Sequence, residues 1–154
     1  MATAIQEYWE RYQEKAQVRL KMPSAWKFGD GTKEMGDTLA NLVIKGIKTA
    51  TTASAIVHEI EEEPFPQVGE YAIILNGDDE PAAIIQYTQI DLVRMNEVSP
   101  AYAAAEGEGD LSYDYWYQAH VNFFTWELGL YDMTFTPDLL LVCQSFRVVD
   151  INQD

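Results

Sequence analysis

Three carboxylates alternate with two glycines in the segment Ala105-Glu106-Gly107-Glu108-Gly109-Asp110. Glycine has no side chain to pack, and it allows backbone conformations that other residues avoid. Carboxylates held close together repel one another, which raises the pKa of at least one of them and prepares it to act as a general acid. We therefore expect a loop that directs carboxylates toward a ligand. The alternative is a solvated acidic turn before a helix, and Asp110 is the best candidate for capping that helix.

A second segment, Gly46-Ile47-Lys48-Thr49-Ala50-Thr51, places a lysine three residues before a threonine. Lysine, hydroxyl and carboxylate together are suited to acid–base or acyl-transfer chemistry. Residues i and i+3 of a strand lie on opposite faces, so Lys48 must precede the regular strand to share a site with Thr51. Lysine acts as a base only where burial or a neighbouring cation lowers its pKa. The alternative is a surface lysine next to a strand threonine.

Aromatic residues supply candidate ligand contacts in two places. Trp26 and Phe28 lie in a glycine-rich loop, from which they can stack on a base. Trp116, His120 and Phe123 follow helical spacing, which indicates a packing stripe first and a ligand platform second. A histidine on such a stripe is more often a hydrogen-bonded core residue than a ligand.

Composition limits the class of protein and of partner. The 154 residues are the usual size of one domain, and 47% hydrophobic residues are enough for a core. Twenty-five acidic and ten basic side chains give a net charge of −15. Because affinity for nucleic acid depends on neutralising phosphates, this charge opposes binding of a long polyanion, and no DNA duplex is expected as a partner. A small ligand with little charge suits the chain better.

Cys143 is the single cysteine, so no disulfide can form within the chain, which fits a reducing cytoplasm. Its apolar neighbours predict a buried structural thiol. With His58 and His120 as the only histidines, we expect neither a metal site nor a cofactor. We see no secretory signal and no apolar run near the ~20 residues that a membrane helix needs.

The coarse pattern predicts a helix over residues 4–20 and a second helix that begins at Asp37 or Thr38. Strands are expected at 48–58, 71–75, 82–95 and 139–149, with helices from Ser99 to the acidic loop and from Ser112 to Gly129. The order contains no βαβ alternation. It favours an α+β fold, a small mostly antiparallel sheet or barrel with helices packed on it. We expect one domain over residues 1–154, with residues 1–22 as an N-terminal helix packed on the rest.

Taken in order, the motifs resemble those of ASCH-domain proteins from about residue 24 to residue 150. The matching segments are Trp26-Lys27-Phe28-Gly29, Leu39 to Val43 with Gly46 to Thr51, Val68-Gly69, Glu106 to Asp110, Trp116 and His120 with Phe123-Phe124, and Val142 to Val149. The specific parts are Glu-Gly-Glu-Gly-Asp and Gly-x-Lys-x-x-Thr.

The resemblance implies a PUA-like fold, a small β-barrel flanked by helices with a cleft between them. ASCH proteins are generally inferred to bind RNA or nucleotides, and some are ribonucleases. A shorter bacterial branch hydrolyses N4-acetylcytidine with the lysine and threonine of the second motif and a downstream glutamate. By that match Lys48 activates the hydroxyl, Thr51 is the nucleophile and Glu108 is the glutamate, with Glu106 as the alternative register. That branch has an arginine soon after its threonine, where this chain has Thr52-Ala53-Ser54.

The resulting hypothesis is a cleft that binds a nucleoside, nucleotide or short RNA and hydrolyses it at an amide or phosphodiester bond. Lys48, Thr51 and Glu108 are the catalytic candidates. The ligand-binding candidates are Trp26, Phe28, Glu106, Asp110, Trp116 and His120. A noncatalytic RNA-binding module and a ligand-sensing domain are the alternatives.

Overall fold

A computed structural model describes residues 2–153 of the chain. The elements, in order, are α1 (Ala4–Ala16), β1 (Ala25–Trp26), α2 (Lys33–Ile44), β2 (Ala50–Ser54), α3 (Ala55–Ile60), β3 (Tyr71–Leu75), β4 (Pro81–Arg94), a 3₁₀ turn (Met95–Glu97), α4 (Pro100–Ala105), α5 (Tyr113–Gly129) and β5 (Leu140–Ile151). The strands form one five-stranded mixed sheet in the order β1-β3-β4-β5-β2. The fold is therefore α+β, as the sequence predicts.

The expected barrel is not formed, because the sheet is open at both ends. β1 pairs only with β3, in parallel, and β2 pairs only with β5, antiparallel. β1 has two residues, which leaves little backbone for a further pairing. No closure joins the edge strands β1 and β2 among residues 2–153.

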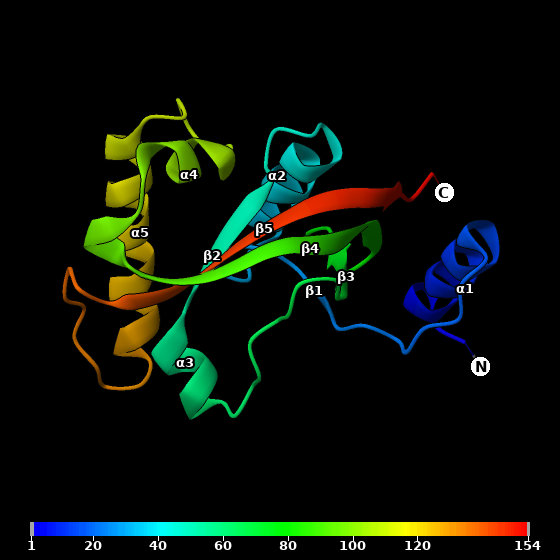
Figure 1. The fold of residues 1–154 in the computed structure, drawn as a ribbon, viewed down its shortest axis with the longest axis horizontal. Helices are drawn as coiled ribbons and strands as arrows, with labels where there is room; N and C mark the ends of the chain where they lie inside the picture. The colour runs from blue at the N-terminus through cyan, green and yellow to red at the C-terminus, as the bar shows by residue number, and fades with distance from the viewer. Residues whose placement is uncertain (1, 154) are drawn as a thin grey trace. The chain divides into compact units, whose positions relative to one another are not determined.

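The chain divides into two compact units. Unit 1 comprises residues 1–46, 69–86 and 147–154, and unit 2 comprises residues 47–68 and 87–146. The strands β4 and β5 therefore contribute residues to both units (Figure 1).

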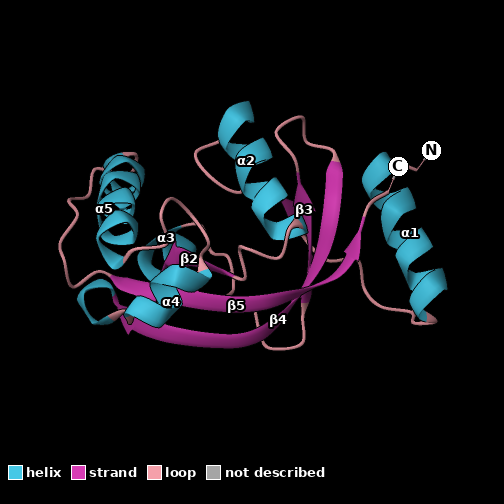
Figure 2. Ribbon diagram, turned by 90° about the horizontal axis from the view of Figure 1, so that it is seen from above, coloured by secondary structure: helices cyan, strands magenta, loops and turns pink. Residues whose placement is uncertain are grey.

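Unit 1 is built around the apolar face of α1. Thr3 and Gln6 form a reciprocal capping box at its start, which satisfies backbone donors that have no partner within the helix. Tyr8, Trp9 and Tyr12 share one face and are buried against Ile73, Leu75 and Ile84. In the same unit α2 lies alongside β3 (Figure 2).

Both predicted helices of unit 1 have different bounds in the structure. α1 ends at Ala16 rather than at residue 20, because Gln17 adopts the left-handed conformation that terminates a helix. α2 begins at Lys33, well before the predicted Asp37 or Thr38. Thr32 is the N-cap and accepts a hydrogen bond from the backbone N–H of Met35.

Unit 2 contains a strand that is shorter than predicted. β2 ends at Ser54, whose hydroxyl accepts a hydrogen bond from the N–H of Val57 and starts α3. The predicted strand over residues 48–58 is therefore wrong after Ser54. Threonine and isoleucine favour strands, but a serine N-cap outweighs that preference here.

The core of unit 2 forms between α4, α5 and the strand residues that face them. α4 lies beside α5 (Figure 1). The buried side chains of this core include Met95, Trp116, Phe124, Leu141 and Cys143. The predicted burial of Cys143 is confirmed, and burial raises the pKa of its thiol to about 12. Within residues 2–153, no helix is both long and apolar enough to cross a membrane.

Candidate functional site

The acidic loop, which comprises Glu106 to Asp110, lies against the chain segment that precedes β2. The backbone N–H of Thr49 donates to the carbonyl of Ala105 at 2.8 Å. Gly107 has a φ of +75°, and a Cβ added there would lie 2.6 Å from the carbonyl oxygen of Ile47 and 2.8 Å from the Cα of Lys48. Glycine is thus required at this position both by backbone conformation and by close approach.

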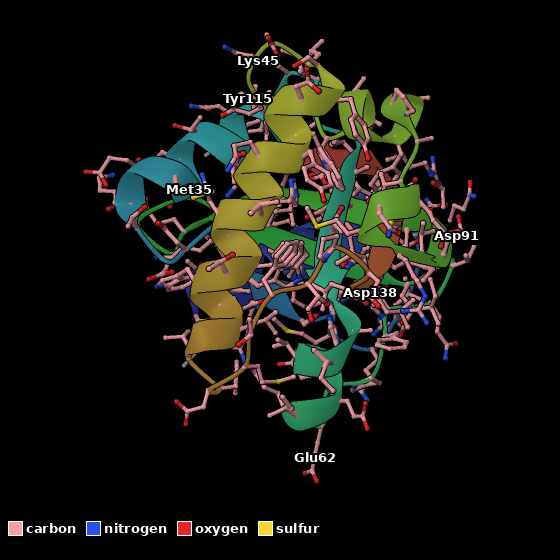
Figure 3. The ribbon with its side chains drawn as sticks, turned by 90° about the vertical axis from the view of Figure 1, so that its left-hand side faces the viewer. Met35, Lys45, Glu62, Asp91, Tyr115 and Asp138 are labelled. Atoms are coloured by element: carbon pink, nitrogen blue, oxygen red, sulfur yellow. The ribbon has the colours of Figure 1, made fainter. Side chains whose placement is uncertain are left out.

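The second glycine of the loop is required by an aromatic ring. A Cβ on Gly109 would lie 2.5 Å from ring atoms of Tyr115, the α5 residue labelled in Figure 3. The two glycines therefore bring the loop against the segment before β2 on one side and against the first turn of α5 on the other. This contact fixes the backbone from which Glu106 and Glu108 extend.

Lys48 joins the two glutamates. Its Nζ donates to Glu106 Oε1 at 3.0 Å, to Glu108 Oε2 at 2.8 Å and to the backbone carbonyl of Glu106 at 3.3 Å. The side chain of Lys48 is 1% exposed and that of Glu106 is 2% exposed. Lys48 lies in the turn before β2, as sharing a site with the loop requires.

Glu106 is the centre of a cluster of charged side chains that also contains Lys48, Glu108 and His120. Its Oε2 accepts hydrogen bonds from Thr52 Oγ1 and from Trp116 Nε1, each at 2.6 Å, and lies 3.1 Å from His120 Nε2. One carboxylate thus connects β2, the end of α4 and α5. Burying a carboxylate is costly unless charged or hydrogen-bonding partners surround it, and here both kinds are present.

The contacts of His120 favour a proton on both ring nitrogens. Nδ1 lies 2.7 Å from the carbonyl oxygen of Trp116, which can only accept, so Nδ1 must donate. Nε2 faces the carboxylate of Glu106 and must donate as well. The ring also stacks on Trp116, with centroids 4.4 Å apart. This geometry therefore favours the positively charged form of His120.

The pKa shifts of Glu106, Lys48 and His120 follow from this geometry. Burial alone would raise the pKa of Glu106, but the charges of Lys48 and His120 outweigh it and hold that pKa well below its usual range. Burial alone would lower the pKa of Lys48, but Glu106 and Glu108 raise it instead. Burial likewise opposes protonation of His120, and Glu106 again raises the pKa. Lys48 and Glu106 are therefore charged at neutral pH, and the contact with Glu106 favours the protonated form of His120.

Glu108 is the acidic member of the cluster that reaches the surface. Its side chain is 21% exposed, against 2% for Glu106. It holds Lys48 through one oxygen while part of the carboxylate remains accessible. Among the charged side chains of the cluster, Glu108 is the most accessible to a ligand.

Thr52 of β2, and not the expected Thr51, directs its side chain toward Glu106. The side chain of Thr52 contacts Glu106, and neighbouring residues of a strand point to opposite faces, so the side chain of Thr51 points away from Glu106. Thr51 contributes its backbone carbonyl, which accepts from Tyr102 Oη at 2.6 Å. The charged Lys48 and this orientation of Thr51 do not provide a lysine base beside a threonine nucleophile.

The structure places the remaining candidate residues in different settings. Trp116 and His120 belong to the cluster. Asp110 accepts from the backbone N–H of Ser112 at 2.9 Å and braces the turn before α5. Trp26 and Phe28 belong to unit 1, where their rings pack edge to face 4.7 Å apart, and Phe28 is buried.

Sequence reasoning missed Thr52 and Tyr102 as parts of the site. Tyr102 Oη lies 3.0 Å from Thr52 Oγ1 and accepts from the backbone N–H of Gln144 at 3.1 Å. It holds β2, α4 and β5 together around the cluster. The spacing of Tyr102 and Glu106, four residues apart across the end of α4, was the available signal.

Unit 2 has acidic side chains in about the same proportion as the whole chain but far fewer basic ones. Its residues include thirteen aspartates and glutamates but only two lysines or arginines, Lys48 and Arg94. Lys48 is buried in ion pairs, and Arg94 donates to the backbone carbonyl of Asp138. No group of three or more histidine, cysteine or acidic side chains within residues 2–153 has the arrangement of a metal site.

A family model and two solved structures are similar to the chain. The family model for the ASCH domain matches residues 24–150. A protein from Enterococcus faecalis of known crystal structure is 46% identical in sequence. The match covers 98% of this chain and 91% of that protein's chain, and the two structures superpose with a TM-score of 0.92. An ASCH domain from Lactobacillus crispatus of known crystal structure is 30% identical in sequence. The match covers 97% of this chain and 96% of that domain's chain, with a TM-score of 0.87.

No curated protein matches the chain. The family model covers well over half of the residues, including Lys48, Glu106, Glu108 and His120. The chain therefore belongs to the ASCH domain family.

Proposed function

We propose that the cluster of Lys48, Glu106, Glu108 and His120 is a binding site for a small, uncharged, nucleoside-like molecule, with Glu108 as the side chain that contacts it. Family membership supports the ligand class, since ASCH proteins are generally inferred to bind RNA or nucleotides. Aligned carboxylate oxygens accept hydrogen bonds from N–H donors, such as those on the edge of a nucleobase.

The observation that carries this proposal is the pairing of a buried ion cluster with one accessible carboxylate. A buried ion pair often contributes less to stability than an apolar packing of the same volume would, so it is weak evidence for a purely structural role. Charged groups with strongly shifted pKa values gather at functional sites. Glu108 is the group through which such a cluster meets a ligand, because its side chain is 21% exposed.

The charge of unit 2 favours a nucleoside over a nucleotide or RNA. A phosphate needs an available cation, and Lys48, Arg94 and His120 of this unit are already held by carboxylates or a backbone carbonyl. Within unit 2, thirteen acidic side chains would repel a phosphate near the site.

A second candidate is hydrolysis of an amide-bearing nucleoside at the same site. It is favoured by the position of Glu108, whose carboxylate is fixed by Lys48 at 2.8 Å and yet is 21% exposed to solvent. In this scheme Glu108 removes a proton from a water molecule, whose oxygen attacks the amide carbon. The C–N bond breaks, and the amine leaves with the proton that Glu108 returns. Lys48 stays protonated and stabilises the carboxylate, and Thr51 takes no part.

The test is calorimetric or NMR titration of the whole chain with cytidine, adenosine, uridine, CMP and a short RNA. We expect a nucleoside to bind, CMP to bind more weakly, and Glu108→Gln to weaken binding by about tenfold, since a charged hydrogen bond becomes neutral. Glu97→Gln, an exposed glutamate of the same unit, is the control and should change nothing. Tighter binding of CMP than of cytidine, or unchanged binding in Glu108→Gln, contradicts the proposal.

The hydrolytic candidate has its own measurement. Mass spectrometry of N4-acetylcytidine incubated with the protein should detect cytidine and acetate if the site is catalytic. Loss of turnover in Glu108→Gln by about 10² to 10⁴ would match removal of a general base, whereas retained turnover in Thr51→Ala would separate this scheme from a threonine nucleophile. Absence of any product leaves binding as the function.

A further inference from the structure

Unit 2 exposes a group of large apolar side chains where α3 and α5 end. Ile60 is 43% exposed, Phe65 37%, Trp126 48%, Leu130 63% and Met133 37%. We call these five residues the α3–α5 face. Single exposed apolar residues are ordinary, but a group of them marks an interaction site.

Local contacts hold the two halves of this face in fixed positions. On the α3 side, the ring of Phe65 packs edge-on against His58, with centroids 5.4 Å apart. On the α5 side, the backbone N–H of Met133 donates to the carbonyl of Leu128 at 2.9 Å and turns the chain back on the helix. Each half therefore has a contact to its own helix, through His58 of α3 and Leu128 of α5.

A hydrogen bond joins the two halves. The hydroxyl of Tyr131 donates to Glu61 Oε1. Burial and the charge of Glu61 raise the pKa of Glu127, which places Glu127 close to the same carboxylate. The end of α3 and the end of α5 are therefore neighbours. Trp126 and Leu130, four residues apart, present their side chains on adjacent turns beside this junction.

The surroundings of the face are acidic on both sides. The acidic neighbours are Glu59, Glu61, Glu62 and Glu63 beside α3, and Glu127 and Asp132 beside α5. No lysine or arginine occurs in residues 49–93 or 95–146. Figure 3 shows the Glu62 side chain projecting outward beyond the end of α3.

We propose that the α3–α5 face docks a basic, amphipathic segment of another protein. Apolar side chains of that segment would cover Trp126, Leu130 and Ile60, while its lysines or arginines would meet the surrounding carboxylates. A second copy of this chain is a poorer occupant. A two-fold contact would place the same acidic side chains opposite one another, in a molecule of net charge −15.

The test is an NMR titration of the whole, isotope-labelled chain with a synthetic helical peptide that has a Leu/Trp stripe flanked by lysines. We expect shifts in the indole N–H of Trp126 and the methyl groups of Leu130 and Ile60, and weaker binding as salt rises. A matched peptide with glutamates in place of the lysines should not bind. Equal binding of both peptides would overturn the charge argument and the proposal with it.

Two pairs of variants test the location. Leu130→Ser should weaken peptide binding by about tenfold or more, since it removes a large apolar contact, whereas Leu92→Ser, 53% exposed on β4, should not. Glu62→Lys should weaken binding, whereas Glu97→Lys should leave it nearly unchanged. Equal effects within either pair overturn the proposal.

Sedimentation of the chain alone decides between the two occupants. We expect a species whose mass does not change with protein concentration. A concentration-dependent dimer that Leu130→Ser abolishes would show that the face belongs to a second copy and would overturn the proposal.

Discussion

Glu106 and Glu108 lie two residues apart yet occupy different environments. Glu106 is 2% exposed and bound by Lys48, Thr52, Trp116 and His120, while Glu108 is 21% exposed. Glu106 therefore supports the loop, and Glu108 is the carboxylate that we propose contacts a ligand. Alternation of carboxylates with glycines produces this division, because each glycine changes the direction of the backbone.

We predict unequal effects of the two isosteric variants on stability. Glu106→Gln leaves the buried charges of Lys48 and His120 without their shared anion and should cost about 3 kcal/mol or more. Glu108→Gln should cost about 1 kcal/mol, because Lys48 keeps Glu106. Urea unfolding of both variants measures the difference. A larger loss in Glu108→Gln would exchange the two roles.

We predict that the stability of the protein depends on pH through the protonation of His120. Its pKa is raised in the folded protein by Glu106 against the opposing effect of burial, so its contribution is fully present below the ordinary value of about 6.5. That contribution is lost as the pH rises through the raised folded pKa. The protein should therefore be more stable to urea near pH 5.5 than near pH 8.5.

The control for this prediction is His120→Gln, because rising net negative charge lowers stability in any variant of this acidic chain. The variant should show a smaller loss of stability between the two pH values than the parent. An identical loss would show that the pKa of His120 is the same in the folded and the unfolded protein.

Lys48 and Thr52 differ in how far the sequence could predict their part in the site. The meeting of Lys48 with the acidic loop was predictable, because only a turn at Gly46 lets that lysine share a site with the loop. The charged state of Lys48 was not predictable, since two carboxylates outweigh burial only when both reach Nζ. Thr52 was missed because one residue decides which face of a strand a side chain occupies.

At the scale of elements, the short α4 and the long α5 hold the acidic loop from both ends. The loop follows α4 directly, and Ser112 caps α5 by accepting from the N–H of Tyr115. The predicted starts of both helices at serine are confirmed, because a serine before an apolar periodic run is a strong signal. The end of β2 was mispredicted, since the threonine-rich run hides the cap at Ser54.

We predict that Gly107→Ala is far more damaging than Gly46→Ala. Both glycines have a φ of +75°, so both variants carry the same backbone strain of about 1–2 kcal/mol. At Gly46 nothing lies within 4 Å of an added Cβ, whereas at Gly107 the carbonyl oxygen of Ile47 lies at 2.6 Å. Thermal unfolding and ligand titration of both variants should show a further loss in Gly107→Ala alone. Equal melting temperatures would mean that the loop shifts freely.

At the scale of the whole molecule, charge is unevenly divided between the two units. Unit 1 contains all the lysines and arginines except Lys48 and Arg94. Several of these are already engaged, as Lys33 is with Asp37 and Asp78 and Lys27 with Asp79. Few cations therefore remain for a polyanion on any part of the surface.

We predict that any binding of short single-stranded RNA is weak and involves two or three phosphates. The logarithm of the affinity should fall with the logarithm of the salt concentration with a slope of about −1.4 to −2.1, since each phosphate on a single strand contributes roughly −0.7. Fluorescence anisotropy at several salt concentrations measures this slope. A slope that corresponds to six or more phosphates would contradict the preference for an uncharged ligand.

The burial of Lys48 has a practical consequence for chemistry performed on the protein. It is the only lysine of unit 2, and its amine is enclosed by two glutamates. Amine-reactive dyes, biotin esters and sensor-chip couplings will therefore attach to unit 1 and leave the acidic loop and the end of α5 unmodified. An immobilised sample should keep both proposed surfaces chemically intact, and slow labelling of Lys48 in a mass-spectrometric time course would report how often the ion cluster opens.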